Sequence, residues 1–122
     1  MDTDQLQNAW PTRIELKKDK SELVVEFDDG SIYNLSAELL RVESPSAEVR
    51  GHGASQKQVL SGCSNVAIRS LEPVGNYAIR IIFDDEHNSG IYSWSYLYEL
   101  GEKKEELWRR YLQMLDSLGL SR

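Results

Sequence analysis

The sequence has little cysteine and no long apolar run, and each scarcity excludes a class of protein. Its single cysteine, Cys63, cannot form a disulfide within the chain or complete an all-cysteine metal site. A reducing cytoplasm is therefore the expected compartment. No stretch reaches the roughly 20 apolar residues of a membrane-spanning helix, and the acidic start Met1–Gln5 lacks the features of a signal peptide. We expect no membrane-spanning segment.

Basic residues are also in deficit, because 14 lysines and arginines face 20 acidic residues and the formal net charge is −6. Affinity for nucleic acids depends on basic side chains that neutralise phosphates. We therefore expect no nucleic-acid partner. The composition does suffice for a core, with 40% hydrophobic residues, three Trp and six Tyr in 122 residues. It predicts one globular domain over residues 1–122, with residues 1–10 as a flexible lead-in.

Alternating apolar residues predict a first β-hairpin. Arg13–Lys17 has the two-residue period of a half-buried strand, and residues 23, 25 and 27 are the apolar positions of the next. Asp29-Gly30 favours a tight turn before a strand over residues 31–35. Ser36 is placed to cap a short helix from Ala37 to about Val42.

Residues 43–65 show no sustained period and predict a long loop, a feature often linked to function when it is ordered. Strand pattern resumes over Val66–Leu71, and residues 72–76 predict a turn. A further strand places Tyr77, Ile79, Ile81 and Phe83 on one face.

The second hairpin resembles the first. Phe27-Asp28-Asp29 with residues 32–36 is echoed by Phe83-Asp84-Asp85 with residues 91–95, which gives strand, acidic turn, strand and capped helix twice. Either an internal duplication or chance similarity between two hairpins explains this resemblance. The second turn, with His87, is the longer one in this comparison.

The last part predicts helices over Trp94–Leu100 and from Glu102 to about Leu118, separated at Gly101. One stripe of the second helix is apolar at helical spacing, which predicts packing on the sheet or, alternatively, an exposed docking face. The stripe consists of Leu107, Trp108, Tyr111, Leu112, Leu115 and Leu118. The predicted class is α+β: antiparallel hairpins forming a sheet, a short helix after the first hairpin, and C-terminal helices packed on the sheet.

The long loop supplies the candidate binding residues Arg50, Gly51, His52, Gly53 and Lys57. Two glycines around a histidine permit close backbone approach, and the basic side chains can bind a carboxylate. A flexible polar loop is the alternative. A hydrolase or isomerase using His52 is a weaker hypothesis, because the sequence shows no nucleophile paired with a base.

Metal and thiol chemistry have less support. The run from Asp84 to His87 could hold a metal but is more typical of a solvated turn, and no closely spaced Cys/His pair of zinc type exists. Cys63 has no recognisable catalytic signature around it and is expected to be an ordinary loop or semi-buried thiol.

Five segments spread over the chain carry a resemblance to a known family: Trp10-Pro11-Thr12, Leu39–Val42, Ser44–Gly53, Leu71–Tyr77 and Gly90–Gly101. In these segments the chain resembles the gamma-butyrobetaine hydroxylase-like N-terminal domains, formerly a domain of unknown function, and particularly the stand-alone bacterial members. The resemblance implies a non-catalytic module that elsewhere precedes an iron- and 2-oxoglutarate-dependent oxygenase domain or is appended to iron–sulfur carriers.

In members of this family that bind zinc, a C-x-C-x-x-C cluster and a later histidine hold the metal. The histidine corresponds to His87, whereas the cysteines correspond to Ser44, Ser46 and Val49. Serine hydroxyls and a valine cannot replace thiolates, so we expect no bound metal and no cofactor.

These observations predict a cytoplasmic, non-enzymatic module that binds a protein partner or a small acidic ligand through residues 43–65 and the hairpin of His87. The alternative is a metal-binding accessory linked to iron–sulfur or 2-oxoglutarate oxygenase chemistry, in which zinc or iron would follow from the family resemblance alone. The sequence does not identify the partner or the oligomeric state.

Overall fold

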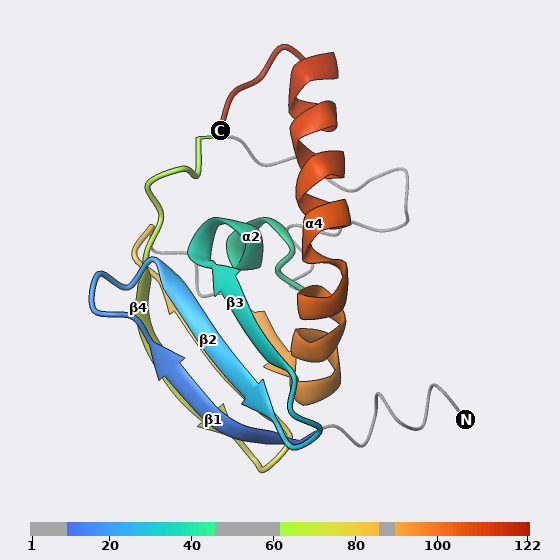
Figure 1. The fold of residues 1–122 in the computed structure, drawn as a ribbon. Helices are drawn as coiled ribbons and strands as arrows, with labels where there is room; N and C mark the ends of the chain where they lie inside the picture. The colour runs from blue at the N-terminus through green and yellow to red at the C-terminus, as the bar shows by residue number, and fades with distance from the viewer. Residues whose placement is uncertain (1–9, 46–61, 86–89) are drawn as a thin grey trace.

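The computed structural model describes residues 10–45, 62–85 and 90–122 and confirms the α+β class (Figure 1). The hairpins are divided between two antiparallel sheets of three strands each. The strands are β1 (Pro11–Leu16), β2 (Glu22–Phe27) and β3 (Ile32–Ser36) in one sheet, and β4 (Ile68–Val74), β5 (Ala78–Phe83) and β6 (Gly90–Ser93) in the other. Helix α2 (Ala37–Val42) follows β3, and helix α4 (Trp94–Ser117) follows β6.

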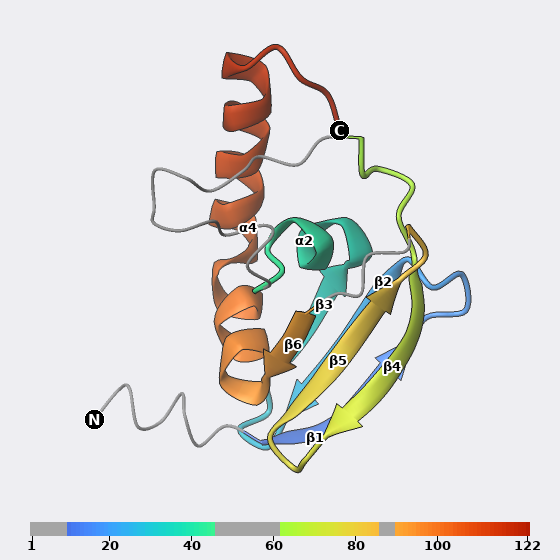
Figure 2. The same ribbon diagram turned by 180° about the vertical axis from the view of Figure 1, so that it is seen from behind.

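The two sheets lie one behind the other with the core between them, and α4 runs alongside β3 and β6 (Figures 1 and 2). Alternation places one face of each central strand inside. Leu23, Val25 and Phe27 of β2 are buried, as predicted, and so are Ile79, Ile81 and Phe83 of β5. Tyr77 is the exception to the predicted face, because it lies exposed in the turn before β5.

The first predicted hairpin and its capped helix are confirmed. Gly30 has a positive φ of 90°, which a residue with a side chain adopts at a cost. The Ser36 hydroxyl accepts a hydrogen bond from the Leu39 amide (3.0 Å) and so caps α2 at the predicted position. Ser93 caps α4 in the same way through the Tyr96 amide (3.1 Å).

The repeat is confirmed as an arrangement of elements, but its residue correspondence differs from the sequence comparison. Both halves consist of three antiparallel strands followed by a serine-capped helix. In the paired registers Leu35 lies opposite Leu23, and Tyr92 lies opposite Ile79. Tyr92 therefore takes the place of Leu35 rather than that of Tyr33, and Ser93 rather than Ser95 corresponds to Ser36.

Two boundaries in the second half differ from the prediction. The strand β4 begins at Ile68 rather than Val66 and continues to Val74, so residues 72–74 belong to the strand and not to the turn. Pro73 is tolerated there, opposite Ile79, because β4 is an edge strand and needs no amide on its free side.

The predicted break at Gly101 is wrong, because α4 is one continuous helix of 24 residues. Gly101 is buried, and a Cβ at this position would overlap the ring of Tyr33 on β3. The glycine therefore provides room for close packing between α4 and β3 rather than a helix end. Neither described helix is both long enough and apolar enough to cross a membrane.

Candidate functional site

The binding residues predicted from the sequence lie outside the described part of the chain. This holds for Arg50, Gly51, His52, Gly53 and Lys57, and also for Ser46, Val49 and His87. Their roles stay predictions. The described residues on either side of these stretches do show where each stretch leaves and rejoins the fold.

Ser44 and Pro45 lie against Gly90, the first residue of β6. A Cβ on Gly90 would come within 2.7 Å of both Ser44 Oγ and Pro45 Cδ. The residue that corresponds to the first zinc cysteine of the family therefore lies beside the hairpin that carries His87. The correspondence of Ser44 and His87 with zinc ligands of the family stays an expectation from the resemblance.

The chemistry of Ser44 does not fit a zinc ligand. Its side chain is buried and hydrogen-bonds with the phenol of Tyr92, which also donates to the Leu40 carbonyl (2.5 Å). A neutral hydroxyl held in this way supplies no thiolate. The described residues contain no group of three or more His, Cys, Asp or Glu arranged to hold a metal.

Cys63 is a buried thiol, more enclosed than the ordinary loop or semi-buried thiol that the sequence predicted. It is 9% exposed, and burial raises its pKa above the ordinary value. A raised pKa lowers the fraction of reactive thiolate at neutral pH. Burial of Cys63 therefore disfavours the thiolate, whereas the surroundings of a nucleophilic cysteine favour it.

Arg41 joins the end of α2 to the turn after β5. Its Nε donates to Asp85 Oδ2 at 2.8 Å, and its side chain is only 12% exposed. The neighbouring Asp84 accepts a hydrogen bond from the Ala67 amide (3.0 Å). The contact between Arg41 and Asp85 anchors the turn that precedes residues 86–89. In the described structure Arg41 therefore holds the second hairpin against α2.

The described structure also has a groove of about 700 Å³ between α4 on one side and α2 and the end of β3 on the other. Its apolar lining comes from Leu39 of α2 and from Trp108 and Leu112 of α4. Charged and polar side chains line the rest: Glu22, Asn34, Ser36, Glu38, Lys104, Glu105, Arg109, Gln113, Asp116 and Arg122.

The apolar stripe predicted for the C-terminal helix explains why this groove exists. Tyr111 and Leu115 are buried in a small cluster with Val42, and Trp108 packs against that cluster. Leu112 stays 39% exposed although it belongs to the same stripe. The stripe is therefore wider than the surface that the domain covers, and its uncovered edge lines the groove. The expected packing is confirmed for the buried part of the stripe, and a docking role for the exposed part stays a prediction.

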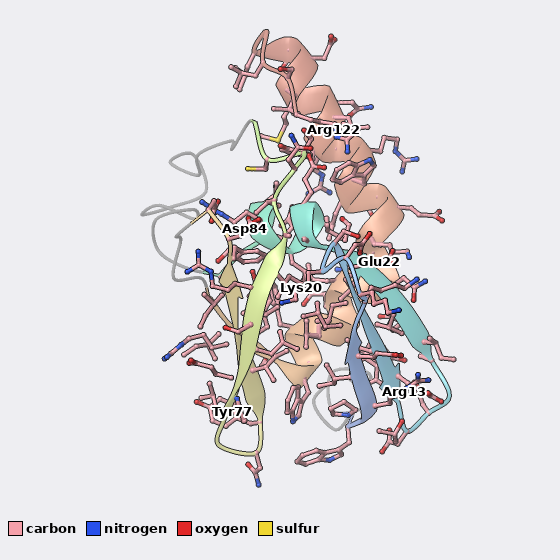
Figure 3. All side chains as sticks on the ribbon, turned by 90° about the vertical axis from the view of Figure 1, so that its left-hand side faces the viewer. Arg13, Lys20, Glu22, Tyr77, Asp84 and Arg122 are labelled. Atoms are coloured by element: carbon pink, nitrogen blue, oxygen red, sulfur yellow. The ribbon has the colours of Figure 1, made fainter. Side chains whose placement is uncertain are left out.

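The end of the groove near α2 contains a buried carboxylate, that of Glu38. The Glu38 side chain is 6% exposed, and its two oxygens accept hydrogen bonds from Arg122, with 2.8 Å between Oε1 and Nη2 and 3.2 Å between Oε2 and Nε. The guanidinium also lies 5.2 Å from the centre of the Trp108 ring. Figure 3 shows Arg122 beside the part of α4 that extends past α2. The carboxylate raises the pKa of Arg122 above its ordinary value.

Sequence reasoning missed this groove and the contact between Glu38 and Arg122. Glu38 follows a predicted cap and has the acidic character common in a first helical turn, so nothing marks it as buried. Residue 122 lies 84 positions away. The one available signal was the excess width of the apolar stripe on α4.

Together these features define a small α+β module with two facing sheets and a groove walled by its long helix. The chain belongs to the gamma-butyrobetaine hydroxylase-like N-terminal domain family, whose model matches residues 14–98. The resemblance stated from the sequence is thereby confirmed.

Several solved structures are similar to the chain. Two proteins determined by NMR in solution share 45% and 43% identity with it, with TM-scores of 0.81 and 0.80. The alignments cover 93% and 94% of this chain and 90% and 86% of theirs. A crystal structure of a protein of unknown function from Acidithiobacillus ferrooxidans, in the DUF971 family, is 33% identical over 80% of this chain and 94% of its own, with a TM-score of 0.63. No curated protein matched.

Proposed function

We propose that the chain is a non-catalytic, cytoplasmic protein-binding module that receives a segment of a partner protein in the groove between α4, α2 and β3. The observation that carries the proposal is the uncovered edge of the α4 stripe. Trp108 and Leu112 face the groove, and Leu112 is 39% exposed although it lies on the helix's apolar side. An exposed apolar strip rimmed by charges is typical of a surface that binds another molecule.

The groove suits a peptide segment of a partner. Most of its lining residues are charged or polar, but most of the lining surface is apolar, which favours burial of a partner's side chains. The charged groups offer both signs for orientation. The edge of β3 is not free for strand pairing near this point, because Lys104 of α4 donates to the Asn34 carbonyl (2.9 Å). We therefore infer that side chains entering the groove, rather than an added β-strand, provide the contact.

In this proposal, the loop residues predicted from the sequence form a second part of the same binding surface. The stretch that carries Arg50, His52 and Lys57 rejoins the described chain at Gly62, whose amide donates to the Ser121 carbonyl (3.1 Å). Ser121 is adjacent to Arg122 at the end of the groove. A partner that fills the groove would thus reach the point where this stretch rejoins the fold.

The test is affinity capture from the source cell, followed by binding of the purified partner to variants of the chain. Leu112→Glu places a charge in the groove and is expected to weaken binding at least about tenfold. Met114→Glu is the matched control, since it lies on the same helix with a similar exposure of 37% but does not line the groove. Equal binding by both variants would contradict the proposed surface.

The contribution of the predicted loop residues to binding has its own test. Arg50→Ala and His52→Ala are expected to weaken binding of the same purified partner. If both variants bind at the wild-type level while Leu112→Glu does not, the groove remains the proposed site and the loop hypothesis is wrong.

A further inference from the structure

The side chains of Glu38 and Arg122 differ strongly in how far they are exposed to solvent. Glu38 lies in the first turn of α2, and its side chain is 6% exposed. The Arg122 side chain is 51% exposed and comes from the segment Leu118–Arg122 that follows α4. A fixed, buried carboxylate is therefore neutralised by an accessible cation.

Apart from the contact of Arg122 with Glu38, the described backbone hydrogen bonds of the segment Leu118–Arg122 lie mostly within the end of α4. The amides of residues 118–120 donate to carbonyls of residues 114–116, and beyond them the Ser121 carbonyl accepts from Gly62 (3.1 Å). Leu118 and Leu120 are 57% and 42% exposed, so this segment buries little apolar surface. Segments with few buried contacts open at a lower free-energy cost than the core does.

Without Arg122, the groove lining would have more acidic than basic side chains. Four acidic side chains would then line it, namely Glu22, Glu38, Glu105 and Asp116, against the two basic side chains of Lys104 and Arg109. Of these acids, Glu22 is already paired with Lys17 (3.2 Å). Lys104 is already bonded to the Asn34 carbonyl. Glu38 would be left as a buried carboxylate that requires a cation, since a buried charge without a partner is costly.

The geometry around Glu38 suits a guanidinium in particular. Two carboxylate oxygens match the fork of a guanidinium, and the Trp108 ring offers a π face on its other side. An ammonium group has no second parallel donor for this arrangement. The site therefore distinguishes an arginine side chain from a lysine side chain by shape, since both carry one positive charge.

We propose that Glu38 and Trp108 form an arginine-binding site, that Arg122 occupies it from within the chain, and that an arginine side chain of the protein partner takes its place. This inference rests on the proposed function because it uses the same groove, and it adds the chemistry of the occupant. The Leu118–Arg122 segment then acts as an internal competitor that a partner must displace, which lowers the apparent affinity of the free chain.

The experiment uses a peptide with the sequence of residues 118–122 and a matched peptide in which citrulline replaces arginine. Binding is followed by tryptophan fluorescence and by NMR shifts of Trp108. The Arg122→Gln variant is expected to bind the arginine peptide at least about tenfold more tightly than the unsubstituted chain does, because the internal competitor is gone. The citrulline peptide, which keeps the shape but lacks the charge, is expected not to bind.

A second substitution tests the carboxylate. Glu38→Gln in the Arg122→Gln background is expected to remove binding of the arginine peptide. Equal affinity of the Arg122→Gln variant and the unsubstituted chain, equal binding of the citrulline peptide, or binding that survives Glu38→Gln would each overturn the proposal.

The unsubstituted chain provides a measurement that does not depend on how any variant folds. Excess arginine peptide is expected to shift the NMR signal of the Arg122 Nε–H group away from its position when bonded to Glu38. A signal that the peptide leaves unchanged overturns the proposal. If Leu112→Glu still weakens capture of the partner in that case, only the arginine site is wrong and the groove function stands.

Discussion

The ring of Tyr33 lies directly against the backbone of α4 at Gly101, so a single methyl group at position 101 would overlap the ring. Tyr33 also makes edge contacts with Phe27 and Tyr98, with ring centres 6.1 and 5.5 Å apart. The contacts of Tyr33 with Tyr98 and Gly101 join the long helix to the first sheet. They determine how closely α4 approaches β3 and therefore position the wall of the groove.

We expect Gly101→Ala to lower the free energy of unfolding by about 2 kcal/mol, because the added methyl group overpacks a filled contact. The sign is informative, since alanine in a helix is otherwise favoured over glycine by about 1 kcal/mol. Chemical denaturation measures the change.

A double-mutant cycle provides the control for this prediction. In a Tyr33→Ala background the overlap disappears, and Gly101→Ala should become neutral or stabilising. The same loss in both backgrounds would mean that the contact with Tyr33 is not the reason for the glycine.

Much of the fold could be predicted because its signals are local. The buried alternation of Leu23, Val25 and Phe27, the Asp29-Gly30 turn and the cap at Ser36 each depend on residues close together in the chain. Gly101 has the same local signal as a helix end. Only its contact with a distant strand shows that it is a packing position.

The candidate site could be predicted less well, because it depends on contacts between distant segments. Glu38 and Arg122 meet across most of the chain, and the burial of Glu38 follows from how α2 packs beside α4. The apolar stripe of α4 is a local signal, and it predicted an exposed docking face only as one of two interpretations, without indicating a groove. Periodicity gives the apolar face of a helix but not how much of that face the domain covers.

The hydrogen bond from the Tyr98 hydroxyl to Asp29 Oδ2 (2.5 Å) predicts a pH dependence of stability. It lowers the pKa of Asp29 below 3.8 and raises that of Tyr98 to about 12. The stabilisation from Asp29 is present above its unfolded pKa and is lost as the pH falls through the lower folded value. The stabilisation from Tyr98 is present below pH 10 and is lost as the pH rises toward about 12.

We therefore expect Tyr98→Phe to cost about 1 kcal/mol or less near neutral pH, because Asp29 is exposed and solvent weakens the bond. The difference from the unsubstituted chain should shrink at both extremes of pH. Denaturation at several pH values measures it, with Tyr77→Phe as the control at an exposed tyrosine. A difference that is constant from acid to alkaline pH would contradict the prediction.

Burial of Cys63 predicts slow chemical modification. Its raised pKa and 9% exposure leave little accessible thiolate, so the reaction with a disulfide reagent at pH 8 should be at least about tenfold slower in the folded chain than in denaturant. Absorbance of the released thiolate follows the rate. Equal rates in the two states would show that the thiol is accessible in the folded chain.

The surroundings of Ser44 predict that the purified chain holds no stoichiometric zinc or iron. The Ser44 hydroxyl is buried and hydrogen-bonded with Tyr92, and the positions that correspond to the family's other two cysteines are Ser46 and Val49. Elemental analysis of the purified chain tests this directly. Stoichiometric metal that His87→Ala removes would contradict it and would favour the metal-binding accessory function.

Zinc binding by a variant with three added cysteines provides the complementary measurement. Ser44 lies against Gly90, the first residue of β6, so a cysteine at position 44 would lie beside the strand that follows His87. The family resemblance assigns the other two cysteines to positions 46 and 49. The triple variant Ser44→Cys, Ser46→Cys, Val49→Cys is therefore expected to gain one zinc per chain and to become more stable when zinc is present. Failure of the triple variant to bind zinc would mean that these four positions do not converge in this chain. In that case, the missing cysteines would not explain the absence of metal.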